Sequence, residues 1–119
     1  MMVQVRILDK IAILDCSGDV DLSSSPRLRE ALLAEIKAHC PSVLVNMSGV
    51  TYIDSSGIAT LVEGLQLSRQ TKTRFGLFGL RPNARSVLEL ARLHKVFTIF
   101  DKEEEALGKI GSVQPFDGL

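Results

Sequence analysis

The chain has 119 residues, of which 45% are apolar and 24% are charged. This length and this mix are those of one globular domain, and they exclude a disordered or fibrous protein. Lys plus Arg and Asp plus Glu are balanced at 14 each and the basic residues are scattered, so we expect no direct binding of nucleic acid. No run reaches the roughly 18 apolar residues of a membrane span, and the first residues lack the layout of a signal peptide. We therefore expect a cytoplasmic protein without a membrane span.

The start of the chain predicts a β-hairpin. Residues 3–7 alternate apolar and polar side chains, as in a strand with one solvated face, and a second apolar run covers 11–14. Asp9-Lys10 between them predicts a tight turn. Residues 17–21, Ser-Gly-Asp-Val-Asp, are rich in turn formers and end the second strand.

A helix and a buried strand are predicted next. Ser25-Pro26 is typical of a helix start, because serine can accept from free amides and proline at the first helical position loses no hydrogen bond. Cys40-Pro41 predicts the end of this helix. The short apolar run 43–45 is typical of a strand that is buried on both faces.

The second half repeats the alternation of helix and strand. In order, the pattern predicts a helix over 58–69, a strand over 75–80, a helix opened by Pro82 and Asn83, a strand over 96–100, and a last helix with a capping-box-like start at Asp101 and Glu104.

The predicted order is a hairpin, then three pairs of helix and strand, then a helix. Strands that alternate with helices predict an α/β fold with right-handed crossovers, in which a mixed, mostly parallel sheet carries an N-terminal hairpin strand and about four packed helices. The apolar periodicity stops near residue 110. We expect one domain over 1–110 and a flexible C-terminal tail over 111–119.

The sequence contains no recognisable catalytic machinery. Ser55 and Ser56 lack the first glycine of a nucleophile elbow, and no phosphate-binding loop motif is present. His39 and His94 are interpreted as surface or cap residues rather than bases. Cys16 and Cys40 are far apart and have no nearby histidine, so we expect two reduced thiols and no metal site.

A phospho-acceptor receiver domain has a similar length and a similar alternation of strands and helices. Its chemistry requires an aspartate at the end of the central strand, a neighbouring acidic pair for magnesium, and a lysine. Here the central strand is followed by Asn46-Met47, the acids Asp19 and Asp21 follow a hairpin strand, and no lysine ends the last strand. We therefore disfavour the receiver function.

The stretch Asp54-Ser55-Ser56-Gly57 lies between an apolar run and a predicted helix. In α/β sheets, functional groups gather where strands end and helices begin. One interpretation is structural, with Asp54 or Ser56 capping the helix and Gly57 leaving room for close packing. The other is regulatory, because a phosphate on Ser55 would be tolerated at a helix N-terminus. The residues alone leave both open.

The chain resembles the anti-sigma factor antagonists, the small single-domain members of the STAS group, from about Val3 to Leu107. The resemblance rests on residues 17–21, on the central stretch 43–58 that includes Asp54-Ser55-Ser56-Gly57, and on the late segment 90–93. It implies a STAS-like fold and a bacterial regulatory protein that binds another protein and needs no cofactor.

The resemblance also implies partners and site residues. The implied partner is an anti-sigma factor that is also a serine kinase and phosphorylates Ser55, so that binding is switched off and transcription by a sigma factor changes. A metal-dependent serine phosphatase would restore the binding form. The implied partner-binding residues are Asp19, Asp21, Asp54, Ser55, Ser56 and Gly57. The alternative is a STAS scaffold that is never phosphorylated, or a subunit of a lipid-transport or stressosome-type complex. Oligomeric state stays open.

Overall fold

The computed structural model of the chain describes residues 1–38 and 40–113. The predicted order of elements is confirmed. The elements are β1 (Met2–Leu8), β2 (Ile11–Val20), α1 (Ser25–Lys37), β3 (Ser42–Ile53), α2 (Ser55–Thr71), β4 (Arg74–Phe78), α3 (Pro82–Leu90), β5 (Ile99–Phe100), α4 (Glu103–Lys109) and a short 3-10 helix, Ile110–Ser112.

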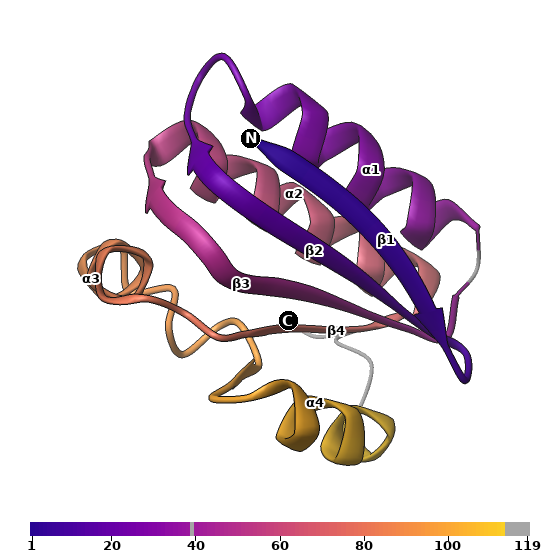
Figure 1. The fold of residues 1–119 in the computed structure, drawn as a ribbon. Helices are drawn as coiled ribbons and strands as arrows, with labels where there is room; N and C mark the ends of the chain where they lie inside the picture. Colours follow the sequence, from indigo (N-terminus) through magenta and orange to yellow (C-terminus); the bar gives the residue numbers. More distant parts are fainter. Residues whose placement is uncertain (39, 114–119) are drawn as a thin grey trace.

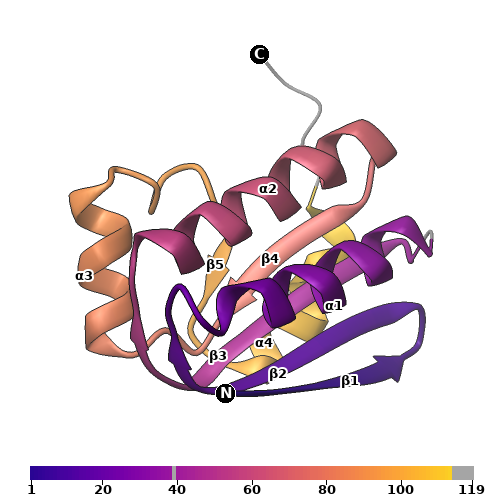
Figure 2. The ribbon, with the colours of Figure 1, turned by 90° about the horizontal axis from the view of Figure 1, so that it is seen from above.

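The five strands form one mixed sheet in the order β1-β2-β3-β4-β5. β1 pairs antiparallel with β2, and the other neighbours are parallel. Figure 1 shows α1 and α2 on one face of the sheet and α4 on the opposite face. In both views α3 lies at one end of the sheet, beside the end of β3 (Figure 2). The predicted α/β class, with a hairpin strand added to a mostly parallel sheet, is confirmed.

The sheet separates two apolar clusters of unequal size. The larger lies under α1 and α2, and it includes Leu14, Leu28, Leu32, Val45 and Leu61. The smaller lies under α4, and its buried members are Ile13, Leu44, Phe78, Phe100, Ala106 and Ile110. Because β2 and β3 contribute to both clusters, their first halves are buried on both faces and read as continuous apolar runs.

The predicted tight turn of the hairpin is confirmed at Asp9 and Lys10. Both residues have positive φ, at 49° and 68°, and the flanking Leu8 and Ile11 are paired across the two strands. A two-residue loop with two left-handed residues is the turn whose twist matches that of a hairpin. Neither residue is glycine, so the strand pairing imposes this conformation.

β2 and β3 are longer than the sequence pattern predicted. Residues 17–20 belong to β2 and residues 46–53 to β3, because the parallel pairing continues to Val20 and Ile53 through two register shifts. Two glycines permit this. Gly18 adopts φ +92°, and a Cβ on Gly49 would lie 2.7 Å from the Cys16 carbonyl oxygen. The expected turn and loop are therefore bulged strand ends.

Four predicted boundaries are wrong. β4 ends at Phe78 and not at residue 80, and Gly79 follows it with φ +74°. Ser24, rather than Ser25, is the N-cap of α1, and it makes no side-chain cap bond to the helix. β5 covers only Ile99–Phe100. α4 starts after Lys102, and the Glu105 carboxylate, rather than that of Glu104, accepts from the Asp101 amide at 3.2 Å.

Phe97, just before β5, is buried although it is not part of a strand. Arg92 has φ +59°, and the chain turns there before Phe97. The Phe97 ring is buried and packs against Phe75 with the ring centroids 6.2 Å apart. Burial of this aromatic pair explains why Phe97 is apolar although it lies outside β5.

The first residues of the expected tail contact the domain. The Val113 carbonyl accepts from Arg74 Nε at 2.9 Å, and Val113 packs on the smaller cluster. Residues 114–119 lie outside the described residues, so the flexibility of 111–119 and the domain boundary at 110 stay predictions.

We predict that Gly49→Ala destabilises the fold by about 1–3 kcal/mol. The added methyl would meet the backbone carbonyl of Cys16 at 2.7 Å, which no side-chain rotation relieves. The matched control is Gly108→Ala in α4, where no atom lies within 4 Å of the added methyl, and there we expect a gain of up to about 1 kcal/mol. Urea unfolding measures both. Equal effects at the two positions would contradict the packing argument.

Candidate functional site

The residues singled out by the sequence meet where β2 and β3 end. Val20 pairs with Ile53, and the Asp54 amide donates to the Val20 carbonyl at 3.1 Å. Asp21 and Asp54 therefore follow neighbouring strands at the same end of the sheet. The N-termini of α1 and α2 lie close to this end (Figure 2).

Asp54 is the N-cap of α2. Its Oδ1 atom accepts from the amides of Ser56 at 2.9 Å and Gly57 at 3.3 Å, and from the Ser56 hydroxyl at 2.6 Å. These bonds satisfy two of the amides that a helix start leaves free. The predicted helix cap is therefore Asp54, and the Ser56 hydroxyl supports it.

Ser55 differs from both of its neighbours. It is the first residue of α2 and is exposed, and its hydroxyl makes no hydrogen bond to any of residues 1–38 or 40–113. The Asp54 carboxylate already takes the Ser56 and Gly57 amides. The turn thus has one hydroxyl that no structural role uses.

Gly57 is buried and packs against the ends of both strands. A Cβ at this position would lie 2.5 Å from Ile53 Cγ1 and 2.7 Å from Val20 Cγ1. The glycine lets α2 start directly against β2 and β3, as the structural interpretation of the turn predicted. The glycine therefore fixes the position of Ser55, two residues earlier, relative to the ends of β2 and β3.

Asp21 organises the turn before α1 in a similar way. Its Oδ1 atom accepts from the Ser23 hydroxyl at 2.7 Å and from the Ser23 and Ser24 amides at 3.0 and 3.1 Å. The Asp21 amide in turn donates to the Ser24 hydroxyl at 2.9 Å. Two acidic turns therefore precede α1 and α2, the two helices on one face of the sheet.

Asp19 and Asn83 fasten the strand ends. The Asp19 carboxylate accepts from the Thr51 hydroxyl at 2.8 Å, which ties β2 to β3. The Asn83 side-chain oxygen accepts from the Ile53 amide at 2.9 Å, and so joins α3 to the end of β3. Sequence reasoning missed this role of Asn83, although an asparagine directly after Pro82 at a helix start was a local signal.

The electrostatics of the two acidic turns are alike. Hydrogen bonds from Ser56, above all from its hydroxyl, hold the pKa of Asp54 below its usual value, and the neighbouring Asp21 charge opposes this. The pKa of Asp21 is lowered chiefly by the Ser23 hydroxyl. Both groups are carboxylates at neutral pH, so the surface around Ser55 is negative before any modification.

Among the described residues, nothing resembles a nucleophile activated by a base. Burial raises the pKa of the Cys16 thiol to about 12, and Cys40 is half-buried with a raised pKa. His94 is half-buried, and its Nδ1 atom has no hydrogen-bond partner in this part of the chain. His39 lies outside the described residues. No group of three metal-ligating side chains occurs within residues 1–38 and 40–113, and no helix there is long and apolar enough to cross a bilayer.

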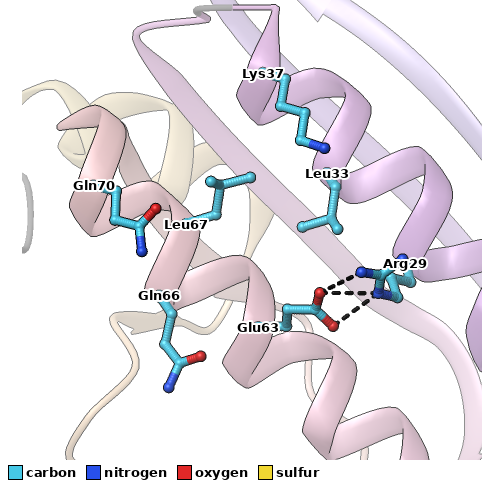
Figure 3. Close-up of a pocket in the computed structure, with 7 residues that line it drawn as sticks. All are labelled: Arg29, Leu33, Lys37, Glu63, Gln66, Leu67 and Gln70. Atoms are coloured by element: carbon cyan, nitrogen blue, oxygen red, sulfur yellow. Dashed lines mark hydrogen bonds and ion pairs between the residues drawn. The ribbon is translucent and has the colours of Figure 1, made fainter.

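A groove lies between α1 and α2 (Figure 3). The ion pair of Arg29 and Glu63, with Nη2 and Oε2 2.6 Å apart, crosses it. Its volume is about 240 Å³, which is below the usual range of small-molecule sites. Its lining is Arg29, Leu33, Lys37, Glu63, Gln66, Leu67 and Gln70. We therefore assign no ligand to it.

Comparison with known proteins identifies the family that this fold and turn define. Residues 2–106 match the STAS domain family, and the chain belongs to that family. It is 30% identical over 98 residues to the anti-sigma-F factor antagonist RsfB of Mycobacterium tuberculosis, covering 82% of this chain and 79% of the relative. The resemblance stated from the sequence is confirmed.

Solved structures share the fold. An anti-sigma factor antagonist from Mycobacterium paratuberculosis superposes with a TM-score of 0.84 at 24% identity, covering 92% of this chain and 93% of the other. The antagonist SpoIIAA in its unphosphorylated form gives 0.80 at 18% identity, covering 94% and 98%. Its phosphorylated form gives 0.72 at the same identity, covering 92% and 99%. These likenesses establish the fold.

We predict that the Asp54 cap weakens in acid. Because the pKa of Asp54 is lower in the folded state, its stabilisation is present above the ordinary value of 3.8 and is lost as the pH falls through the folded value. The measurement is the gap in urea midpoint between the wild type and Asp54→Asn, which keeps an acceptor but does not titrate. The gap should close below pH 3.8. A gap that is constant with pH would show that the charge does not stabilise the cap.

Proposed function

We propose that this chain is an anti-sigma factor antagonist, which binds an anti-sigma factor serine kinase and is released when the kinase phosphorylates Ser55. The observation that carries the proposal is the exposed Ser55 hydroxyl at the start of α2, which is unused in the described structure while Asp54 and Ser56 are engaged in the cap. Membership of the STAS family and the names of the relatives support the partner class.

The geometry explains how a phosphate would act. A phosphoserine carries about −1.5 to −2 charges at neutral pH. The Ser56 and Gly57 amides are already bonded to the Asp54 carboxylate, and the Ile58 amide to the Asp54 carbonyl. A phosphate on Ser55 therefore stays at the surface, where it adds charge and bulk beside Asp54. The fold tolerates it, and a partner lying on this turn does not.

The proposed partner surface is formed by the two acidic turns at the end of the sheet where β2 and β3 finish. Asp21 and Asp54 present their charges there, and Ser55 lies in the second turn. Asp19 and Gly57 contribute by holding the strand ends and the helix start in place. Ser56 acts through the Asp54 cap. The exposed Leu22, 78% accessible, adds an apolar contact next to Asp21.

The chain is proposed to be a substrate and a binding partner rather than an enzyme. Its activity is a change of affinity, so the modifying chemistry belongs to the kinase and to a metal-dependent serine phosphatase that removes the phosphate. Neither reaction requires a cofactor or a metal on this chain. Binding is expected to control transcription through the sigma factor that the kinase holds.

The first prediction from this function concerns the site of modification. Incubation with the kinase and ATP should place one phosphate on Ser55, because the Ser56 hydroxyl is held by Asp54 at 2.6 Å. Mass spectrometry of proteolytic peptides locates it. Ser55→Ala should abolish incorporation of phosphate. The control Ser23→Ala, which removes an exposed hydroxyl of the Asp21 turn, should not. Phosphate on Ser56, or no phosphate, would contradict the assignment.

The second prediction separates charge from shape. Ser55→Asp should weaken kinase binding, whereas Ser55→Asn, of nearly the same size without the charge, should bind nearly as well as the wild type, as should Ser55→Ala. Isothermal titration with the purified kinase measures the affinities. All three variants should unfold within about 0.5 kcal/mol of the wild type, since Ser55 makes no side-chain bond to the described residues. Unfolding of Ser55→Asp would identify the residue as a structural cap.

The competing function is a scaffold of constant affinity. A scaffold would not be phosphorylated by a cognate kinase, and Ser55→Asp would leave its assembly unchanged. The two experiments above therefore distinguish a switched antagonist from a scaffold directly.

A further inference from the structure

β1 is an edge strand whose outer edge has no neighbour among the described residues. It is the first strand in the sheet order and pairs only with β2. Figure 1 shows it along one margin of the sheet, and α1 lies over the neighbouring face. An unprotected edge of this kind is a template for pairing with another strand.

β1 is unusually apolar for an exposed edge. Four of its seven residues are large exposed apolar side chains: Met2 at 57%, Val5 at 42%, Ile7 at 57% and Leu8 at 41%. Val3, Val5 and Ile7 lie on the α1 face, since their partners on β2 are Cys16, Leu14 and Ala12 of the larger cluster. Met2, Gln4, Arg6 and Leu8 lie on the other face.

The hairpin register fixes which backbone groups are free. The two-residue turn closes on the pair of Leu8 and Ile11, which is a hydrogen-bonded pair in such hairpins. The N–H and C=O groups of alternate residues therefore point to β2, and those between them point outward. The outward set is Val3, Val5 and Ile7, which are all β-branched and suited to a strand interface.

The order of polar and apolar side chains along β1 is the same in both directions. Met-Val-Gln-Val-Arg-Ile-Leu is symmetric about Val5 in polarity. We propose that β1 pairs antiparallel with β1 of a second copy of this chain, about a twofold axis at Val5, so that the two sheets join. Val5 then faces Val5, Val3 faces Ile7, Met2 faces Leu8 and Gln4 faces Arg6 across the axis.

This register uses all three outward residues and keeps like charges apart. A twofold axis at Arg6 would place the two guanidinium groups opposite each other. An axis at Gln4 would place Ile7 opposite Met1, which lies outside β1. The axis at Val5 avoids both costs, and it is also the centre of the outward hydrogen-bonding groups.

Arg6, the charged residue of β1, does not prevent another strand from pairing with the outer edge. Arg6 Nε and Asp15 Oδ2 are 2.5 Å apart, and Arg6 Nη2 and Glu103 Oε1 are 2.6 Å apart. These pairs draw the guanidinium toward β2 and α4 and neutralise it. Edge strands are usually kept single by a free charge, and the described part of β1 carries none.

The α1 side of the edge has a hollow that the second copy can fill. A cavity of about 430 Å³ lies beside Val3, and α1 lines it with Arg27, Glu30, Ala31 and Ala34. In the proposed register Ile7 of the second copy faces Val3 on this same side. Arg27 and Glu30 have opposite charges, so two copies that approach here need not repel each other.

The test is the association state of the full chain and its response to one substitution. Sedimentation equilibrium from micromolar to millimolar concentration should show a monomer–dimer equilibrium. Val5→Arg puts two positive charges at the axis and should weaken the dimer by at least about tenfold. The matched control is Val96→Arg, because Val96 is also 42% exposed but lies far from β1 in the sequence; it should leave the equilibrium unchanged.

Amide hydrogen exchange of the wild type tests the register independently, including the case in which Val5→Arg fails to fold. As concentration rises, the amides of Val3, Val5 and Ile7 should gain protection, whereas those of Gln4 and Arg6, already bonded to β2, should not change. A chain that stays monomeric at millimolar concentration overturns the proposal. So does a dimer without this alternating pattern, or one equally weakened by both substitutions.

Discussion

The hydrogen bond from the Asp54 amide to the Val20 carbonyl ties the residue after β3 to the end of β2, and α2 begins directly afterwards without an intervening loop. Asp54 ends the ladder between β2 and β3 with its backbone and starts the helix with its carboxylate. Two constraints follow. The residue at the third helical position must be glycine, because Val20 and Ile53 leave no room for a Cβ. The first helical residue must lie on the side of the helix away from the sheet, because it is two positions, or about 200° of helical turn, from the buried Gly57. The exposure of Ser55 is therefore a consequence of how the strand ends.

The fold could be predicted from the sequence where periodicity is strong and local. The hairpin, the two helices over the larger cluster and the buried run 43–45 all have a clear pattern. The lengths of β2 and β3 could not be predicted, because Gly18 and Gly49 look like turn residues yet permit bulges in a continuing ladder. The last strand was overestimated for the opposite reason. Phe97 is buried by a turn that packs it on Phe75, and an apolar residue in the sequence does not show whether a strand or a turn buries it.

The candidate site also has features that the sequence could predict and features that it could not. The cap by Asp54 and the close packing at Gly57 are local, so the four-residue motif contained them. The bond between Asn83 and the Ile53 amide joins residues 30 positions apart, so the place of Asn83 after Pro82 indicated a helix start but not which amide its side chain would bind. The bonds of Asp21 to Ser23 and Ser24 are local, but the sequence analysis interpreted residues 17–21 only as turn formers that end the second strand. The motif could not show that both acidic turns lie at the same end of the sheet, because that follows from the parallel pairing of β2 and β3.

The Ser55 turn and the free edge of β1 occupy different parts of the sheet. Ser55 follows β3, two strands from the edge, at the end of the sheet where Met2 pairs with Ser17. In an antiparallel pair of β1 strands, the Met2 end of one copy lies beside the Leu8 end of the other. The two Ser55 turns would then lie at opposite ends of a continuous sheet, and neither would be covered. Each copy could then bind and release its own partner. A phosphate on one Ser55 turn would remove one contact and leave the other. Dimerisation would therefore change the avidity for the partner without changing the chemistry of the switch.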